Sequence, residues 1–165
     1  MKKILLSLLL LASPLSAIGE TVNINIHGYI TAMPCELVKT SYLIDLKKIN
    51  IWNIKDTQKS PWVDFSVKLK NCPMGTNEAI MTISGTPDLT TAEYFLNKGT
   101  AQNVALNLAN GANKTTIKNG DKIITPVNSL TRSVEIPFSA RVAGYGSGMM
   151  PGSFNSHLEF TFVYH

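Results

Sequence analysis

The clearest pattern in the chain is a strict alternation of apolar and polar positions over residues 21–31. Successive side chains of a β-strand point to opposite faces of the sheet, so this alternation predicts a strand with one buried face. Ten residues of strand extend roughly 33 Å, at about 3.3 Å per residue. One face would carry Val22, Ile24, Ile26, Gly28 and Ile30, and the other Asn23, Asn25, His27 and Tyr29.

Further short apolar or alternating segments follow along the chain. The candidate strands are Tyr42–Ile49, Val63–Leu69, Ala79–Ser84, Val104–Leu108, Lys122–Thr125, Ser133–Val142 and Leu158–Tyr164. Turns rich in Gly, Asn and Pro separate them, and this arrangement is typical of an antiparallel β-sandwich. We also expect a short helix around Thr91–Leu96, and no long amphipathic helix.

The last candidate strand is strongly apolar on one face, and no hairpin partner follows it. Leu158, Phe160, Phe162 and Tyr164 share that face. The far side of such a strand must be covered by an earlier strand, covered by another chain, or left as an open edge prone to aggregation. An ordinary terminal strand inside a complete sandwich fits the pattern equally well.

Residues 1–19 have the pattern of a secretory signal peptide. Lys2 and Lys3 form a basic start, and the apolar run from Ile4 to Leu11 is too short to span a bilayer. We expect cleavage after Gly19, with cleavage after Ala17 as the alternative, and an uncleaved anchor helix is the other interpretation. The mature chain is therefore expected outside the cytoplasm.

Composition indicates one domain without a nucleic-acid partner. The chain has 165 residues, and removing Lys2 and Lys3 from its 15 Lys and Arg leaves 13 against 11 Asp and Glu. A chain of this length fits a single domain. Because the basic residues are scattered and the mature charge is small, nucleic-acid binding is not expected.

Export also decides how Cys35 and Cys72 are interpreted, because disulfides form in oxidising compartments. We expect one disulfide between them. Two free thiols, or one nucleophilic thiol, are the alternatives. A nucleophile would need a histidine partner, and the chain offers His27, His157 and His165.

Residue clusters that would support catalysis or metal binding are missing from the sequence pattern. The histidines do not have zinc-site spacing, the acidic residues are dispersed, and no Gly-x-Ser-x-Gly motif occurs. Trp52 and Trp62 are expected in the core or half-exposed rather than as sugar-stacking platforms. We therefore expect no enzyme activity, no metal or other cofactor and no small-molecule substrate.

Taken in order, several landmarks resemble the fimbrial subunits (pilins) of the chaperone–usher pathway in Gram-negative bacteria. The landmarks are the signal peptide, the alternating strand containing Gly28, Pro34-Cys35, Phe65-x-Val67-x-Leu69-x-Asn71-Cys72, Gly152-x-Phe154-Asn155 and the penultimate Tyr164. The chain is most similar to the minor, adaptor-type subunits of type 1-like fimbriae. Residues 38–62 depart from the family pattern, because they are rich in Lys and Asn and lack the usual glycines.

The resemblance implies an incomplete immunoglobulin-like β-sandwich that lacks its final strand. A hydrophobic groove would remain beside the C-terminal strand, and a periplasmic chaperone would lend a strand to fill it. At the outer-membrane usher, the N-terminal extension of the neighbouring fimbrial subunit would replace the chaperone. This is β-augmentation, in which backbone hydrogen bonds give affinity and side chains in pockets give specificity.

Carried onto this chain, the resemblance implies a signal peptide at 1–19, a donor extension at 20–34 and a pilin domain at 35–165. The donor residues would be Val22, Ile24, Ile26, Gly28 and Ile30, and the acceptor or chaperone-binding residues Leu158, Phe160, Phe162 and Tyr164. Cys35 and Cys72 would form the family's disulfide. The protein would then support cell adhesion from a fimbria on the cell surface.

The main alternative is a secreted β-sandwich that is complete in itself, such as a carbohydrate-binding module. The two hypotheses differ in residues 20–33, which would fold back onto their own chain in a module and dock onto another chain in a fibre.

Overall fold

The computed structural model describes residues 24–28, 33–145 and 148–165, and the predicted signal peptide lies outside these ranges. The chain divides into two units, Met1–Thr31 and Ala32–His165. In the first unit, residues 24–28 have no assigned secondary structure. The second unit holds all the assigned elements of the described residues. They are β1 (Glu36–Leu37), α1 (Ile51–Ile54), β2 (Val63–Lys70), β3 (Glu78–Gly85), β4 (Phe95–Leu96), β5 (Val104–Asn110), β6 (Thr116–Ile117), β7 (Lys122–Pro126), β8 (Val134–Gly144) and β9 (Leu158–Tyr164).

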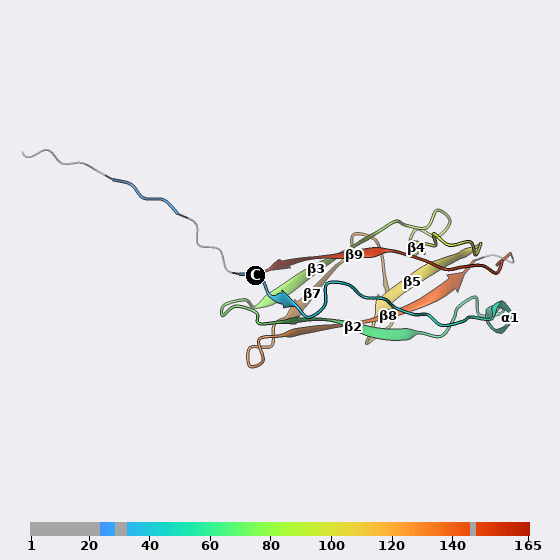
Figure 1. The fold of residues 1–165 in the computed structure, drawn as a ribbon, viewed down its shortest axis with the longest axis horizontal. Coiled ribbons are helices and arrows are strands. Elements are labelled where there is room, and N and C mark those ends of the chain that lie inside the picture. Colours follow the sequence, from blue (N-terminus) through green and yellow to red (C-terminus); the bar gives the residue numbers. More distant parts are fainter. Residues whose placement is uncertain (1–23, 29–32, 146–147) are drawn as a thin grey trace, which may run out of the picture. The chain divides into compact units, whose positions relative to one another are not determined.

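The second unit is an antiparallel β-sandwich, as the spacing of short strands predicted (Figure 1). The larger sheet has the order β1-β2-β8-β5-β4, with β6 paired to β5. The smaller sheet has the order β7-β3-β9. None of the helices in the described part of the chain is long and apolar enough to cross a membrane.

The core lies between the two sheets because alternate residues of each strand face inward. In β8 the inward row contains Val134, Ile136 and Phe138, each at most 3% exposed. In β3 the residues Met81 and Ile83 are fully buried in the same way. Burying a side chain of this size contributes about 1.5–3 kcal/mol, so these rows supply much of the stability of the sandwich.

Five of the predicted later strands are confirmed with small changes at their ends, and a sixth, Leu158–Tyr164, is reproduced at both ends. The predicted strand Tyr42–Ile49 is wrong, because residues 39–50 have no assigned secondary structure. Its alternation is nevertheless real: Tyr42, Ile44 and Leu46 are half-buried between exposed neighbours. A strand also requires a hydrogen-bonded partner, which hydrophobic alternation alone cannot report.

The predicted helix around Thr91–Leu96 is also wrong. The Asp88 carboxylate accepts hydrogen bonds from the backbone N–H groups of Thr90 and Thr91, each at 2.9 Å, and so holds a turn. Such side-chain to backbone bonds compete with helix formation. The chain then enters β4, where Phe95 pairs with Leu106.

A one-turn helix, α1, forms where none was predicted. Asn50 caps it, because its side-chain oxygen accepts a hydrogen bond from the backbone N–H of Trp52 at 3.0 Å. Ile54 anchors the helix in the interior with 4% exposure.

Candidate functional site

The last strand, β9, lies at one edge of the smaller sheet. On one side it pairs with β3 along its whole length, from Gly85–Leu158 to Ala79–Tyr164. On its other side, none of the strands assigned in the described ranges is paired with it. Its N–H and C=O groups on that side are therefore available to an added strand.

The inward row of β9 is half-buried, whereas its outward neighbours are exposed. The half-buried side chains are Leu158, Phe160, Phe162 and Tyr164, the residues that the sequence assigned to an acceptor groove. They lie on one face of one strand, as the alternation predicted. Phe162 and Tyr164 stack with ring centroids 6.3 Å apart.

The segment 39–50 forms the opposite wall of a long groove that β9 borders. The groove has a volume of about 2470 Å³ and is lined by residues of this segment, of α1, of β9 and of the larger sheet. Its floor is apolar and comes from the inward rows of three strands. These floor residues are Phe65, Val67, Leu106, Leu108, Ala140 and Val142. The sequence analysis did not identify this segment as a wall of a groove. The alternation of its residues was the signal that could have indicated it.

The proposed donor residues fall partly within the described ranges. Ile24 is 77% exposed and Ile26 is 89% exposed. A Cβ added at Gly28 would have no neighbour within 4 Å. Val22 and Ile30 lie outside the described residues.

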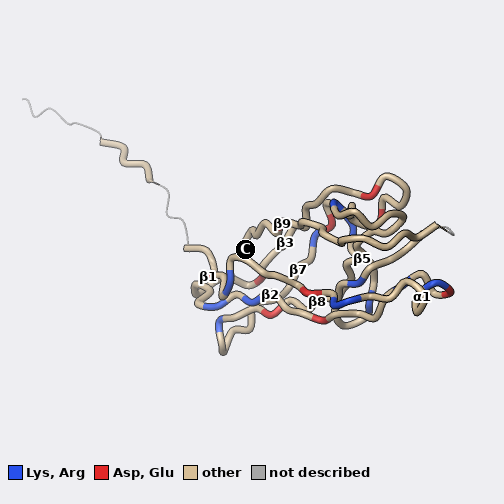
Figure 2. Tube along the Cα trace, turned by 45° about the vertical axis from the view of Figure 1, so that its right-hand side comes forward, with Lys and Arg blue, Asp and Glu red and all other residues tan. Residues whose placement is uncertain are grey.

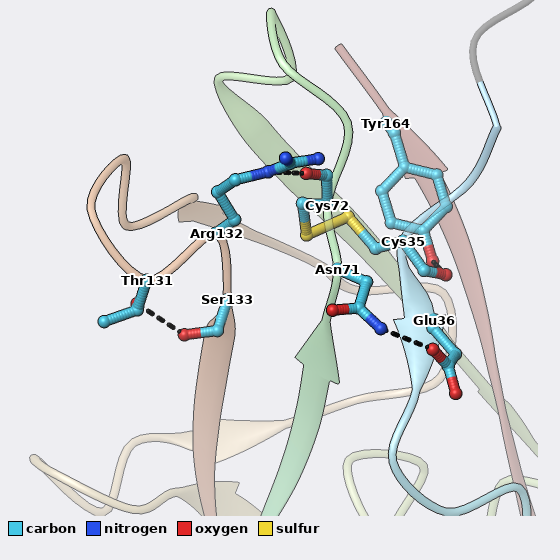
Figure 3. The surroundings of a disulfide bond; sticks show 8 residues. All are labelled: Cys35, Glu36, Asn71, Cys72, Thr131, Arg132, Ser133 and Tyr164. Carbon is cyan, nitrogen blue, oxygen red and sulfur yellow. Dashed lines mark hydrogen bonds between the residues drawn. A yellow bond between two sulfur atoms is a disulfide. The ribbon is translucent and has the colours of Figure 1, made fainter.

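One end of the domain is held by a disulfide between Cys35 and Cys72, as export and the resemblance predicted (Figure 3). The bond joins the residue before β1 to the segment after β2. The Arg132 Nε donates a hydrogen bond to the Cys72 carbonyl at 2.6 Å, and the Tyr164 hydroxyl lies 3.5 Å from the Cys35 carbonyl oxygen. The disulfide therefore ties the start of the domain close to the end of β9.

Some charged groups of the domain form ion pairs at its surface, such as Lys68 with Glu135 at 3.0 Å. Figure 2 shows basic and acidic positions interspersed along the chain. Glu36 accepts hydrogen bonds from Lys70 and Asn71, which lower the pKa of its carboxyl group. Burial raises the pKa of the Tyr164 hydroxyl above its ordinary value. In the part of the chain that the structure describes, His, Cys, Asp and Glu residues form no cluster that could hold a metal ion.

The prediction that both tryptophans lie in the core or half-exposed is confirmed for Trp62 and wrong for Trp52. Trp62 is half-buried, and the Arg141 guanidinium lies 3.8 Å from the centroid of its ring. Trp52 of α1 is 77% exposed.

Comparison with known proteins agrees with this architecture. The family model described as "Fimbrial protein" matches residues 24–165. Protein FimG of Escherichia coli (strain K12) is 28% identical over 162 residues, covering 98% of this chain and 95% of that protein. An uncharacterized fimbrial-like protein of the same strain, YdeR, is 24% identical over 144 residues, covering 87% of this chain and 84% of that protein.

Solved structures share the fold. A subunit of a chaperone–usher pilus matches with a TM-score of 0.67 and 16% identity, over 93% of this chain and all of that one. The P pilus rod subunit PapA matches with a TM-score of 0.63 and 14% identity, over 87% of this chain and all of that one.

The chain therefore belongs to the fimbrial protein family, and the predicted resemblance is confirmed. Its role is that of a structural subunit of a fimbria.

Proposed function

We propose that this protein is a minor, adaptor-type subunit of a chaperone–usher fimbria, linked to its neighbours by donor-strand exchange. Residues 20–34 are the donor extension, and residues 35–165 form the pilin domain that accepts a neighbour's extension. A chain with both parts occupies a position inside the fibre, where it supports cell adhesion.

The observation that carries this proposal is the open groove between β9 and the segment 39–50. β9 is paired only with β3 among the assigned strands of the described residues, and residues 39–50 have no assigned pairing. A strand inserted between them can form backbone hydrogen bonds with both walls. Its inward side chains can cover Phe160 and Phe162, which are otherwise only half-buried.

The donor extension has the composition that such a groove requires. Ile24 and Ile26 both present exposed apolar side chains that a groove on another chain could bury. Burying Val22, Ile24, Ile26 and Ile30 would contribute roughly 6–12 kcal/mol before ordering costs, at about 1.5–3 kcal/mol each. Gly28 presents no side chain and suits a shallow part of the groove.

The same mechanism defines the partners and the route of export. A periplasmic chaperone covers the groove of the unassembled subunit, and the outer-membrane usher brings the neighbouring subunit to it. The signal peptide at residues 1–19 directs the chain to the periplasm, and the assembled fimbria lies on the cell surface. Neither nucleic acid nor a small-molecule substrate takes part.

The test uses the mature chain and a version that lacks residues 20–33, both with the disulfide formed. Thermal unfolding is recorded with and without a synthetic peptide of residues 20–33, and then with the extensions of candidate neighbours. A bound peptide at 100 times its Kd adds about 2.7 kcal/mol of stability, so the midpoint should rise by several degrees. A stable fold indifferent to every peptide would instead support the self-complete binding module.

A further inference from the structure

Exposed apolar side chains lie near the point where the proposed donor extension joins the pilin domain. Cys35 follows the extension, and its partner Cys72 exchanges backbone and side-chain hydrogen bonds with Arg132, at 3.0 and 2.6 Å. Each exposed side chain lies two residues from one of these positions. They are Met33, Met74 and Leu130, which are 80%, 88% and 94% exposed and which we call the root surface. Isolated apolar residues are ordinary on a protein surface, whereas several beside one disulfide make a surface that another protein can cover.

A second set of exposed apolar side chains lies where the groove reaches α1. Figure 1 shows α1 and the C-terminus at opposite ends of the second unit. Trp52 of α1 is 77% exposed and Met150 is 50% exposed, and both residues line the groove. We call these two residues the groove-end surface.

The groove-end surface is held in place by the backbone around it. The Asn50 cap and the buried Ile54 fix α1, so that Trp52 between them faces outward. Met150 exchanges two backbone hydrogen bonds with Gln102, at 3.1 and 3.2 Å. A surface fixed before binding loses little conformational freedom when a partner covers it, and tryptophan is enriched among the residues that dominate binding energy.

The direction of an added strand brings the two surfaces together. β9 runs toward the disulfide, because the Tyr164 hydroxyl lies 3.5 Å from the Cys35 carbonyl oxygen (Figure 3). All strand pairs assigned in the described residues are antiparallel, and we take the added strand to follow them. An extension antiparallel to β9 enters at the disulfide end, and its C-terminal residues leave the groove at the α1 end.

The connection between the extension and its own domain is short. Cys35 follows Ile30, the last residue of the donor row, by five residues. Five residues span at most about 18 Å, at about 3.3–3.6 Å each. The disulfide end of the incoming subunit is therefore held close to α1 of the subunit that accepts its extension.

We propose, resting on the donor-strand function above, that the root surface of one copy of this chain packs against the groove-end surface of a second copy. The occupant is a second copy because the chain carries both halves of the contact. Such a contact is head-to-tail and repeats along a fibre without closing. It stabilises the link between subunits beyond what the extension alone provides, and it limits bending at the short connection.

The test compares binding of a whole second copy with binding of the extension alone. It uses the full mature chain with its disulfide formed. Self-assembly is measured by sedimentation, and a fluorescent peptide of residues 20–31, which ends before Met33, is titrated onto dilute chain. Trp52→Ala should weaken self-assembly by about 30-fold, as expected for loss of a tryptophan at the centre of a contact, and leave the Kd of the peptide unchanged. Ile124→Ala, at a 61% exposed site of β7, is the matched control and should change neither quantity.

A double-mutant cycle tests whether the two surfaces touch. Leu130→Ala should also weaken self-assembly without changing peptide binding. The double variant Trp52→Ala, Leu130→Ala should weaken it by less than the product of the two single effects, because each substitution removes the same contact. Both side chains are exposed in the single chain, so the unfolding midpoints of the peptide-bound variants should match that of the peptide-bound wild type.

The outcomes distinguish this contact from the proposed function. Wild-type assembly by Trp52→Ala would overturn the contact and leave donor-strand binding standing, as would effects of Trp52→Ala and Leu130→Ala that simply multiply. A wild-type chain that binds the peptide but does not assemble with itself would also overturn the contact between copies. If the wild type does not bind the peptide, donor-strand binding by this extension and the contact both fail.

Discussion

Phe138 of β8 stacks on Phe160 of β9, with ring centroids 5.3 Å apart and ring planes inclined by 18°. This contact joins the larger sheet to the smaller one across the core. Phe138 also stacks on Phe65 of β2 at 5.3 Å, and it is completely buried. The aromatic stack therefore extends from the centre of the sandwich to the floor of the groove beside β9.

Replacing Phe138 with alanine should lower the free energy of unfolding by about 3–5 kcal/mol, because it removes the ring and leaves a cavity. The measurement is equilibrium denaturation with a constant denaturant slope. Val163→Ala, at a half-exposed outward site of β9, is the control, and its effect should stay within about 0.5 kcal/mol. An effect of Phe138→Ala below 1 kcal/mol would contradict its central place in the core.

Removing the disulfide should destabilise the domain. Cys35 and Cys72 are separated by 37 residues, and closing a loop of that length is worth roughly 4 kcal/mol on the chain-entropy model. Denaturation of the double variant Cys35→Ala, Cys72→Ala measures this. Reduction of the disulfide in the wild type should give the same loss of stability. Equal stability of the double variant and the oxidised wild type would contradict the prediction.

Replacing Gly28 with leucine should slow or block subunit exchange, because the new side chain would meet a shallow part of the groove. The complex of the monomer with its chaperone should remain intact, since Gly28 takes no part in that complex. Assembly from purified chaperone–subunit complexes, followed by gel electrophoresis, measures the rate. Asn25→Leu, on the opposite face of the predicted strand, is the control and should assemble normally. Normal assembly of Gly28→Leu would contradict the assignment of Gly28 to a shallow part of the groove.

Acid should weaken the domain through its surface carboxylates. Hydrogen bonds from Lys70 and Asn71 lower the pKa of Glu36, and those from Lys114 and Ser139 lower the pKa of Asp64. A carboxyl group whose pKa is lower in the folded state than in the unfolded state stabilises the protein at pH values above its unfolded pKa of about 4. This stabilisation is lost as the pH falls through the folded pKa.

The denaturation midpoint should therefore decline below about pH 4, and Glu36→Gln should make the decline shallower. Glu93→Gln, at an exposed site in the turn before β4, is the control and should retain the wild-type slope. An unchanged slope in Glu36→Gln would show that its ion pair with Lys70 does not contribute to acid sensitivity.

Much of this structure could be predicted from local pattern. The strand β9 was predicted with both ends correct, because its apolar and polar residues alternate without interruption. The pairing of Cys35 with Cys72 followed from export and from a count of two cysteines. Segments that depend on side-chain to backbone bonds were missed, as the turn held by Asp88 and the cap at Asn50 show.

The sequence by itself determined the class of fold and the faces of its strands, because the alternation of side chains is a local property with a period of two residues. It also determined the inward row from Leu158 to Tyr164. Only the tertiary structure decided that residues 42–49, despite the same alternation, remain unpaired along the wall of a groove. Strand pairing depends on which segments meet in space. The groove exists because two alternating segments face each other, and none of the strands assigned in the described residues lies between them.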